Sequence, residues 1–224
     1  MIKRYVFQLL LFFLVFFIAN YAQSQRFSED VQSMLLNEKS SDTANCPILF
    51  VGSSSFTKWH DVNDYFPETH ILNRGFGGST LLDQMEYATK LIFSCHPRQI
   101  VIYCGENDLA ENERLSGAAV YKRFKHFYRM IKKQFPDMPV AFISLKPSQS
   151  RWNLQAKMQK ANRKIKRFLQ CHHRGEFIDV YSLMLGEDGK PIPQIFIEDN
   201  LHMNKQGYMI WKKAIDPVLI PMNK

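Results

Sequence analysis

The sequence predicts an α/β fold in which helices cover both faces of a five-stranded parallel sheet, a three-layer α/β/α sandwich. Apolar segments of strand length alternate along the chain with longer segments whose apolar residues recur at helical spacing. The strand-like segments lack strict polar and apolar alternation, which is typical of strands covered on both faces. Strands that alternate with helices are joined by right-handed crossovers and run parallel. With 224 residues, 46% hydrophobic and 22% charged, the chain suits one globular domain.

The first residues have the pattern of a signal peptide. A basic start precedes an apolar run from Leu9 to Ile18, and small residues follow at Ala22 and Ser24, where cleavage could fall. The run is shorter than the ~20 residues of a membrane span, so an uncleaved anchor is the less favoured alternative. We expect export to the periplasm or beyond the cell. The expected parts are a signal peptide (1–24), a lead-in segment (25–45) and the folded domain (46–224).

Five strands and four helices are expected in the folded domain. The strands read PILFVG, THILNRG, RQIVIYCG, PVAFISL and GEFIDV, at residues 47–52, 69–75, 98–105, 139–145 and 175–180. The helices are expected at residues 80–93, 120–135, 154–169 and 204–219. The second and third have apolar residues three or four positions apart, on one helical face. The last ends near Pro217, because proline cannot continue a helix.

Polar, glycine-rich clusters follow the first three strands. They read GSSS at 52–55, NRGFGGST at 73–80 and CGEND at 104–108. In doubly wound parallel sheets a ligand binds beyond the carboxyl ends of the strands, where the winding reverses. With strand order 2-1-3-4-5, these three strand ends are neighbours, and the reversal lies between strands one and three. The sequence therefore predicts a site at this edge.

An acid and a base are present near the end of the chain, in EDNLHMN at residues 198–204. Asp199 and His202 are three residues apart and can share one turn, so the carboxylate can fix the tautomer of the imidazole. The free ring nitrogen can then take a proton from a serine hydroxyl, which is otherwise a weak nucleophile. Ser54, His202 and Asp199 could supply such a catalytic triad.

The oxyanion formed by serine attack needs fixed hydrogen-bond donors. The backbone N–H groups of Ser54 and Gly78 and the side-chain amide of Asn107 could supply them. Glycine at position 78 leaves room for a substrate to approach the backbone, and the amide of Asn107 donates without adding a charge.

Each cluster also has a structural explanation when taken alone. Serines after a strand are often turn or cap residues, glycine-rich segments form tight turns, and a lone histidine is commonly a surface residue. The four clusters occur in a workable order at strand ends, however, and this conjunction favours catalysis.

Together, the four blocks resemble those of the SGNH hydrolases, also called GDSL hydrolases. LFVGSSS, NRGFGGST, GEND and DNLH are similar to the four family blocks, over about residues 46 to 220. The resemblance assigns the nucleophile to Ser54, the oxyanion hole to Ser54, Gly78 and Asn107, and the remaining triad to Asp199 and His202. It implies a flavodoxin-like fold, no metal or other cofactor, and hydrolysis of acyl esters through an acyl-enzyme.

The chain departs from the family pattern at Ser53, where an acidic residue is usual. That residue is not the proton acceptor, so we expect altered local hydrogen bonding and retained activity. Ser53 and Ser55 are expected to cap or turn the chain. Glu106 and the segment SLKPSQSRW (144–152) resemble a bacterial subgroup that includes platelet-activating-factor acetylhydrolase-like proteins and sugar-ester esterases.

Other side chains are weaker candidates for substrate contact. Trp59 could line an acyl or sugar pocket, although packing in the core is the favoured interpretation. Arg74 and Trp152 could contact substrate, with a surface position and packing as their alternatives.

The cysteines and the basic residues suggest no further chemistry. The four cysteines lack zinc-ligand spacing, and Cys46 and Cys95 could be joined by a disulfide. The formal net charge is +8, with sixteen Lys or Arg and one acid between residues 114 and 174. Solvated helix faces are favoured there over a surface that binds anionic partners, and no nucleic-acid module is recognisable.

The expected protein is a serine esterase for short acyl groups such as acetyl, acting on a small-molecule or carbohydrate ester. The alternatives are a lysophospholipase-like lipid esterase and a non-catalytic carbohydrate-binding module on the same fold. An α/β-hydrolase is disfavoured, because Phe56 stands where that fold needs a glycine. A flavin or nucleotide binder is disfavoured because no matching glycine pattern is present. The sequence does not identify the ester or the oligomeric state.

Overall fold

The computed structural model of the protein describes residues 26–38 and 46–221. The predicted signal peptide lies outside these residues. The chain divides into two units, and the described part of the first, residues 26–38, contains helix α2 (Ser28–Asn37). The sequence did not predict this helix in the lead-in segment, because the helix lacks a side-chain N-cap and contains a single buried residue, Val31.

The described part of the second unit, residues 46–221, forms a parallel sheet with the strand order β2-β1-β3-β4-β5. The predicted α/β fold and strand order are therefore confirmed. Each strand lies inside its predicted range: β1 (Ile48–Gly52), β2 (Ile71–Gly75), β3 (Gln99–Tyr103), β4 (Val140–Ile143) and β5 (Gly175–Ile178). Every residue of β1, β3 and β4 is buried, which explains their continuous apolar runs.

The register of the sheet brings three strand ends to the same level. Gly52 at the end of β1 is opposite Gly75 of β2 and Tyr103 of β3. The chain passes closely here, because a Cβ atom on Gly52 would lie 2.0 Å from the carbonyl oxygen of Tyr103. Only glycine can occupy this position. Because the three strand ends are at the same level, the three polar clusters begin side by side.

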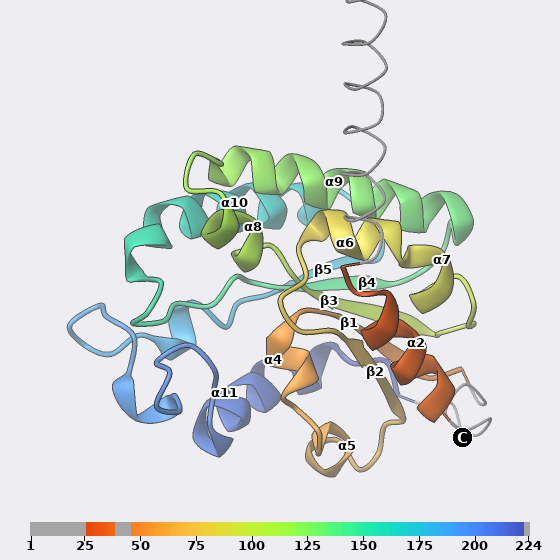
Figure 1. The fold of residues 1–224 in the computed structure, drawn as a ribbon, viewed down its shortest axis with the longest axis horizontal. Coiled ribbons are helices and arrows are strands. Elements are labelled where there is room, and N and C mark those ends of the chain that lie inside the picture. Colours follow the sequence, from red (N-terminus) through yellow and green to blue (C-terminus); the bar gives the residue numbers. More distant parts are fainter. Residues whose placement is uncertain (1–25, 39–45, 222–224) are drawn as a thin grey trace, which may run out of the picture. The chain divides into compact units, whose positions relative to one another are not determined.

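Helices cover both faces of the sheet, as Figure 1 shows. One layer contains α6 (Leu81–Glu86), α7 (Ala88–Leu91), α8 (Glu106–Glu111), α9 (Gly117–Gln134) and α10 (Gln155–Gln170). The other contains α4 (Ser54–Thr57), α5 (Val62–Tyr65) and α11 (Lys205–Ile215). Helices α9 and α10 pack against each other and bury the apolar positions that the sequence spacing indicated.

The helices differ from the prediction in a break, an end and an additional helix. The helix expected at 80–93 is divided into α6 and α7 at Tyr87, where ψ is 4° and the backbone leaves helical geometry. The last helix ends at Ile215, and a 3₁₀ turn (Asp216–Val218) containing Pro217 continues from it. Helix α8 was not predicted, because its six residues are too few to show an apolar period.

No disulfide forms among the described cysteines. Cys46 is exposed and Cys95 is buried, and both carry thiols, as do Cys104 and Cys171. The suggested pairing of Cys46 with Cys95 is therefore wrong for this structure. Residues that precede neighbouring strands need not have the short Cα separation and facing Cβ vectors that a disulfide requires.

Candidate active site

Ser54 is presented by a sharp turn between β1 and α4. Ser53 occupies the N-cap position in an extended conformation, and its backbone N–H donates to the Tyr103 carbonyl at 3.0 Å. Its own carbonyl accepts from the backbone N–H of Phe56 at 2.9 Å. Ser53 thus caps α4 through its backbone and makes no side-chain cap bond. Ser54, the first residue of α4, is half-buried at the sheet edge.

A cluster of aromatic side chains packs between α11 and this turn. The hydroxyl of Tyr208 donates to the carbonyl of Ser55 at 2.8 Å, which ties α11 to the start of α4. The Tyr208 ring stacks on Trp59, with centroids 4.7 Å apart, and Phe56 meets Trp211 edge to face. The turn that carries Ser54 is thus fixed by packing as well as by hydrogen bonds.

His202 reaches Ser54 across 148 residues of sequence. Its Nε2 atom is 2.8 Å from the Ser54 hydroxyl oxygen, and its Nδ1 atom is 2.5 Å from Oδ2 of Asp199. Oδ1 of Asp199 accepts from the backbone N–H groups of Leu201 and His202 at 2.9 and 2.8 Å. One carboxylate therefore shapes the loop and orients the imidazole, and the structure brings together the three residues predicted as a triad.

The carboxyl group of Asp199 is held in its ionised form. Partial burial raises its pKa, but the hydrogen bonds from the His202 side chain and from the backbone of His202 and Leu201 outweigh this and lower the pKa to about 2. An ionised Asp199 favours the tautomer of His202 in which Nδ1 carries the proton, leaving Nε2 free to accept one.

Gly78 lies in the loop after β2 and Asn107 in the first turn of α8, and the adjoining strand ends bring these two segments together. Gly78 has a φ of 78°, in the left-handed region that favours glycine. Asn107 is buried and donates from Nδ2 to the Ser79 carbonyl at 3.0 Å. Since an amide nitrogen carries two hydrogens, one N–H of Asn107 is left for another acceptor.

Further hydrogen bonds join the loops after β1, β2 and β3. Gln84 Nε2 donates to the Gly52 carbonyl at 3.0 Å and to the Ser79 hydroxyl at 2.9 Å. Oδ2 of Asp108 accepts from the backbone N–H of Leu81 at 2.9 Å, while Oδ1 pairs with Arg123 at 2.6 Å. The loop containing Gly78 is therefore anchored on both sides.

A buried charge cluster lies directly beside Asn107. Glu106 accepts from the Tyr103 hydroxyl at 2.5 Å and pairs with Lys146 at 3.2 Å and with Arg151 at 3.1 Å. Glu106 and Lys146 are almost fully buried. Burial raises the pKa of Glu106, but the two cations outweigh this and lower it, so that Glu106 remains ionised.

Sequence reasoning missed the role of Lys146. In the sequence, Glu106 and the 144–152 segment indicate only a family subgroup. The available signal was a lysine directly after the apolar run of β4, at the same edge of the sheet as the other polar clusters. The Ser150 N–H and hydroxyl both donate to the Asn200 carbonyl, at 3.2 and 3.1 Å, so this segment also contacts the loop that contains Asp199 and His202.

Two of the weaker candidates for substrate contact, Arg74 and Trp59, are buried, and for Trp59 this is the core packing that the sequence favoured. Arg74 is 2% exposed, and its guanidinium donates to the carbonyl of Leu91 at 2.6 Å and to the Ser94 hydroxyl at 3.1 Å, so it joins β2 to α7. Trp59 is fully buried in the aromatic cluster. Both side chains are enclosed by protein and cannot reach a substrate. Trp152 is half-buried and lines a cavity.

Neither a metal-binding cluster nor a spanning segment is found in the described ranges. Residues 26–38 and 46–221 contain no group of three or more His, Cys, Asp or Glu side chains arranged to hold a metal ion. Within the same ranges, no helix has the length and hydropathy needed to cross a membrane.

Comparison with known proteins gives one family match and several similar structures. The model of the GDSL-like lipase/acylhydrolase family matches residues 42–210. No curated protein matches the chain.

The similar structures have low sequence identity. A Streptococcus pneumonia protein named as a candidate platelet activating factor has a TM-score of 0.72 at 19% identity, covering 92% of this chain and 99% of its own. A GDSL-like lipase from Bacteroides thetaiotaomicron has a TM-score of 0.69 at 20% identity, covering 88% and 97%. A carbohydrate esterase family 3 protein from Talaromyces cellulolyticus has a TM-score of 0.60 at 12% identity, covering 76% and 94%. These likenesses support the fold.

Proposed function

Because the chain belongs to the GDSL-like lipase/acylhydrolase family and is a carboxylic ester hydrolase, we propose that it cleaves short acyl esters with Ser54 as the nucleophile. The observation that carries this proposal is the continuous hydrogen-bonded line from Asp199 through His202 to Ser54. The three groups come from opposite ends of the domain, and their alignment matches what a serine nucleophile needs. A non-catalytic binding module does not agree with the family assignment.

In the proposed reaction, His202 acts first as a base. Its Nε2 takes the proton of the Ser54 hydroxyl as the oxygen attacks the ester carbonyl, and the C=O electron pair moves onto the oxygen. When the tetrahedral intermediate collapses, the C–O bond to the alcohol breaks and His202 gives its proton to the leaving oxygen. Water then repeats the sequence on the acyl-enzyme and releases the acid. Asp199 stays ionised throughout and stabilises the imidazolium.

The proposed oxyanion donors are the backbone N–H groups of Ser54 and Gly78 and the second amide hydrogen of Asn107. The buried position of Asn107 supports this role, because a donor in a region of low dielectric stabilises a developing charge more than one in water. The ion pair of Glu106 with Lys146 restricts the first turn of α8, from which Asn107 donates.

The preferred substrate is an acetylated or similarly short-chain ester of a carbohydrate. The sequence shows no obvious long insertion for enclosing a fatty acyl chain, and a carbohydrate esterase is among the proteins with a similar fold. A lysophospholipid ester is the second candidate, favoured by the sixteen basic residues between 114 and 174. Export through the N-terminal segment would bring the enzyme to such substrates.

Hydrolysis of p-nitrophenyl acetate, butyrate and decanoate by the purified protein tests the proposal. We expect rates that fall with acyl length and that decrease at least about 10³-fold in Ser54→Ala. Ser53→Ala is the matched control, because it removes a neighbouring hydroxyl that makes no cap bond. Retention of full activity by Ser54→Ala would exclude the proposed nucleophile, and faster hydrolysis of decanoate would favour the lipid alternative.

A further inference from the structure

Arg151 lies beside the candidate active site and contacts it on two sides. Its Nη1 atom is 3.1 Å from Oε1 of Glu106, the residue before the proposed oxyanion donor Asn107. The N–H and hydroxyl of the preceding residue, Ser150, donate to the carbonyl of Asn200, in the loop that supplies the proposed base. Arg151 is therefore placed between the segment with the oxyanion donor and the segment with the base.

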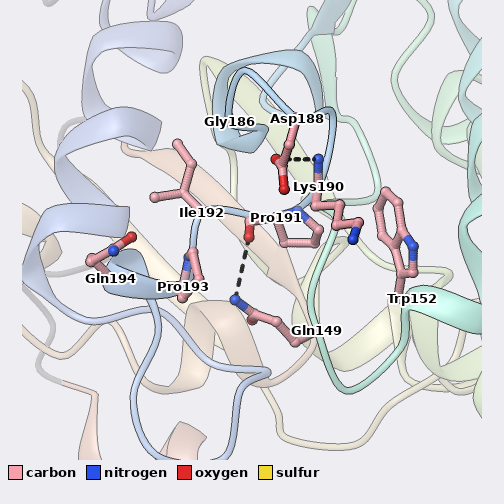
Figure 2. A pocket seen from close by; sticks show the side chains of 9 residues that line it. All are labelled: Gln149, Trp152, Gly186, Asp188, Lys190, Pro191, Ile192, Pro193 and Gln194. Atoms are coloured by element: carbon pink, nitrogen blue, oxygen red, sulfur yellow. Dashed lines mark hydrogen bonds between the residues drawn. The ribbon is translucent and has the colours of Figure 1, made fainter.

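The segment around Arg151 directs its side chains to two places. Gln149 and Trp152 line a cavity of about 380 Å³ together with the loop at residues 186–194, as Figure 2 shows. Nε2 of Gln149 donates to the Pro191 carbonyl at 3.4 Å, which joins the two walls of this cavity. Arg151 is not part of the cavity lining, and its side chain extends to the buried charge cluster instead. The backbone from which it extends is thus held by hydrogen bonds to two other loops.

The guanidinium of Arg151 has hydrogen-bond donors that the protein does not use. A guanidinium carries five N–H groups. In the described part of the chain, Glu106 is the one ion-pair partner of Arg151. Both oxygens of Glu106 also contact Lys146, and Oε2 accepts from the Tyr103 hydroxyl, so Glu106 cannot take up the other donors. The side chain of Arg151 is 20% exposed and none of its nitrogen atoms is buried without a partner, so the unused donors face solvent.

The other carboxylate of the site, Asp199, has no oxygen left for Arg151. Its Oδ1 atom accepts from two backbone N–H groups, and its Oδ2 atom pairs with His202. Asp199 also acts on the charge cluster: burial lowers the pKa of Lys146, and Asp199 is one of the carboxylates that oppose this shift. Among the described residues, the carboxylates beside Arg151 are thus already occupied, and an anion on a ligand would find its donors available.

The surface that continues from Arg151 is strongly basic. Residues 138–174 contain no Asp or Glu. Helix α10 begins four residues after Arg151 and carries five exposed cations, Lys160, Arg163, Lys164, Lys166 and Arg167. A surface of one sign raises the local concentration of ligands of the opposite sign. An uncharged sugar ester would gain nothing from this field.

We propose that Arg151 binds an anionic group of the substrate, a carboxylate or a phosphate, in the alcohol part of the ester. The inference rests on the proposed esterase function and adds a substrate class to it. The anion belongs to the alcohol because the proposed acyl group is short and uncharged. The planar guanidinium, oriented by Glu106, pairs with two oxygens of either anion through its exposed edge. Acidic carbohydrates and lysophospholipids both carry such a group.

The test compares three aromatic acetate esters, 4-acetoxybenzoate, 4-acetoxyphenyl phosphate and the uncharged 4-acetoxybenzamide. In Arg151→Gln we expect the ratio of kcat/KM for an anionic ester to kcat/KM for the amide to fall about tenfold, through a higher KM for the anion. Arg151→Lys keeps the charge without the planar donor pair and should show a smaller fall. The control is Arg163→Gln, an exposed arginine on α10, which should keep the wild-type ratio at about 0.15 M salt, where distant charges are screened.

The ratio separates binding of the anion from folding. Both esters are measured on the same variant, so a loss of folded protein lowers both values and leaves their ratio unchanged. A fall for 4-acetoxybenzoate alone supports the site and indicates an acidic carbohydrate, and a fall for the phosphate alone supports it and indicates a lysophospholipid. Unchanged ratios in Arg151→Gln would overturn the inference, as would an equal fall in Arg163→Gln, which would indicate the general field of the basic surface.

Calorimetric titration with 4-acetoxybenzoate and 4-acetoxyphenyl phosphate separates this inference from the esterase proposal. We expect one of these anions to bind to Ser54→Ala and to lose its binding in the double variant Ser54→Ala/Arg151→Gln. Full hydrolysis by Ser54→Ala, with a ratio that still depends on Arg151, would reject the proposed nucleophile and keep the anion site. Loss of hydrolysis in Ser54→Ala, with a ratio independent of Arg151, would reject the anion site alone.

Discussion

The block after β3 (residues 104–108) and the loop at residues 198–204 both contribute to the candidate site. Different kinds of contact hold them in place. The side chain of Glu106 is 4% exposed and that of Asp199 is 41% exposed. Glu106 pairs with Lys146, 40 residues away, and Asn107 reaches back 28 residues to Ser79. Asp199 instead bonds within its own loop, to residues two and three positions later.

Because of this difference, substitutions in the two regions should change different properties of the protein. The block after β3 is part of the core, so a change there alters folding as well as the proposed oxyanion site. The loop of Asp199 and His202 is built mainly from short-range hydrogen bonds at the surface, so a change there should affect the reaction far more than the fold.

The largest effect is expected for His202→Ala. Loss of the base should lower kcat by about 10³- to 10⁴-fold, because the serine hydroxyl is no longer deprotonated. The free energy of unfolding, measured by urea unfolding, should change by about 1 kcal/mol or less. His173→Ala, an exposed histidine on another turn, is the control. A large loss of stability in His202→Ala would remove the distinction between the two regions.

The second effect is on stability and concerns Lys146→Met. Removal of one member of a buried ion pair leaves Glu106 with fewer partners, and we expect a loss of about 3 kcal/mol in the free energy of unfolding. Urea unfolding measures this, with the exposed Lys160→Met on α10 as the matched control. If the two variants are equally stable, the charge cluster does not support the fold.

Asn107→Ala tests both properties at once. A lost oxyanion donor should reduce kcat by about 10²- to 10³-fold with a smaller change in KM. The lost bond to the Ser79 carbonyl should also lower stability by about 1 to 3 kcal/mol, since this buried acceptor keeps only the weak Cys104 thiol as a donor. Exposed Asn153→Ala serves as the control. Reduced kcat at unchanged stability would mean that the amide is not needed to hold the Gly78 loop.

The smallest expected effect is a pH dependence of stability at the exposed loop. The pKa of Asp199 is lowered from 3.8 to about 2 in the folded protein, so its ionised form stabilises the fold above about pH 4. This contribution should be lost as the pH falls through 2. We expect the melting temperature of the wild type to approach that of Asp199→Asn between pH 4 and pH 2, by a small amount because solvent screens the exposed carboxylate. A constant difference over this range would contradict the assignment.

The strands and the four site blocks could be predicted because each leaves a local pattern. Buried parallel strands require continuous apolar runs, and the turn after β1 requires a glycine beside Tyr103. The Asp199–His202 spacing fits one turn, so its hydrogen bond could be expected from the sequence. In contrast, the break at Tyr87 leaves no comparable pattern, because both of the short helices around it keep helical spacing.

By itself, the sequence determined the α/β fold, the strand positions and the residues that meet at the sheet edge, because these depend on short-range spacing. Only the tertiary structure decided which charged and aromatic side chains are available to a substrate. Lys146 enters the core through an ion pair between neighbouring strand ends, and Arg74 is enclosed where its guanidinium donates to the carbonyl of Leu91 at the end of α7. The cavity beside Trp152 likewise depends on two loops about 40 residues apart. Burial and pairing arise from contacts between distant segments, and the spacing of residues along one segment does not encode them.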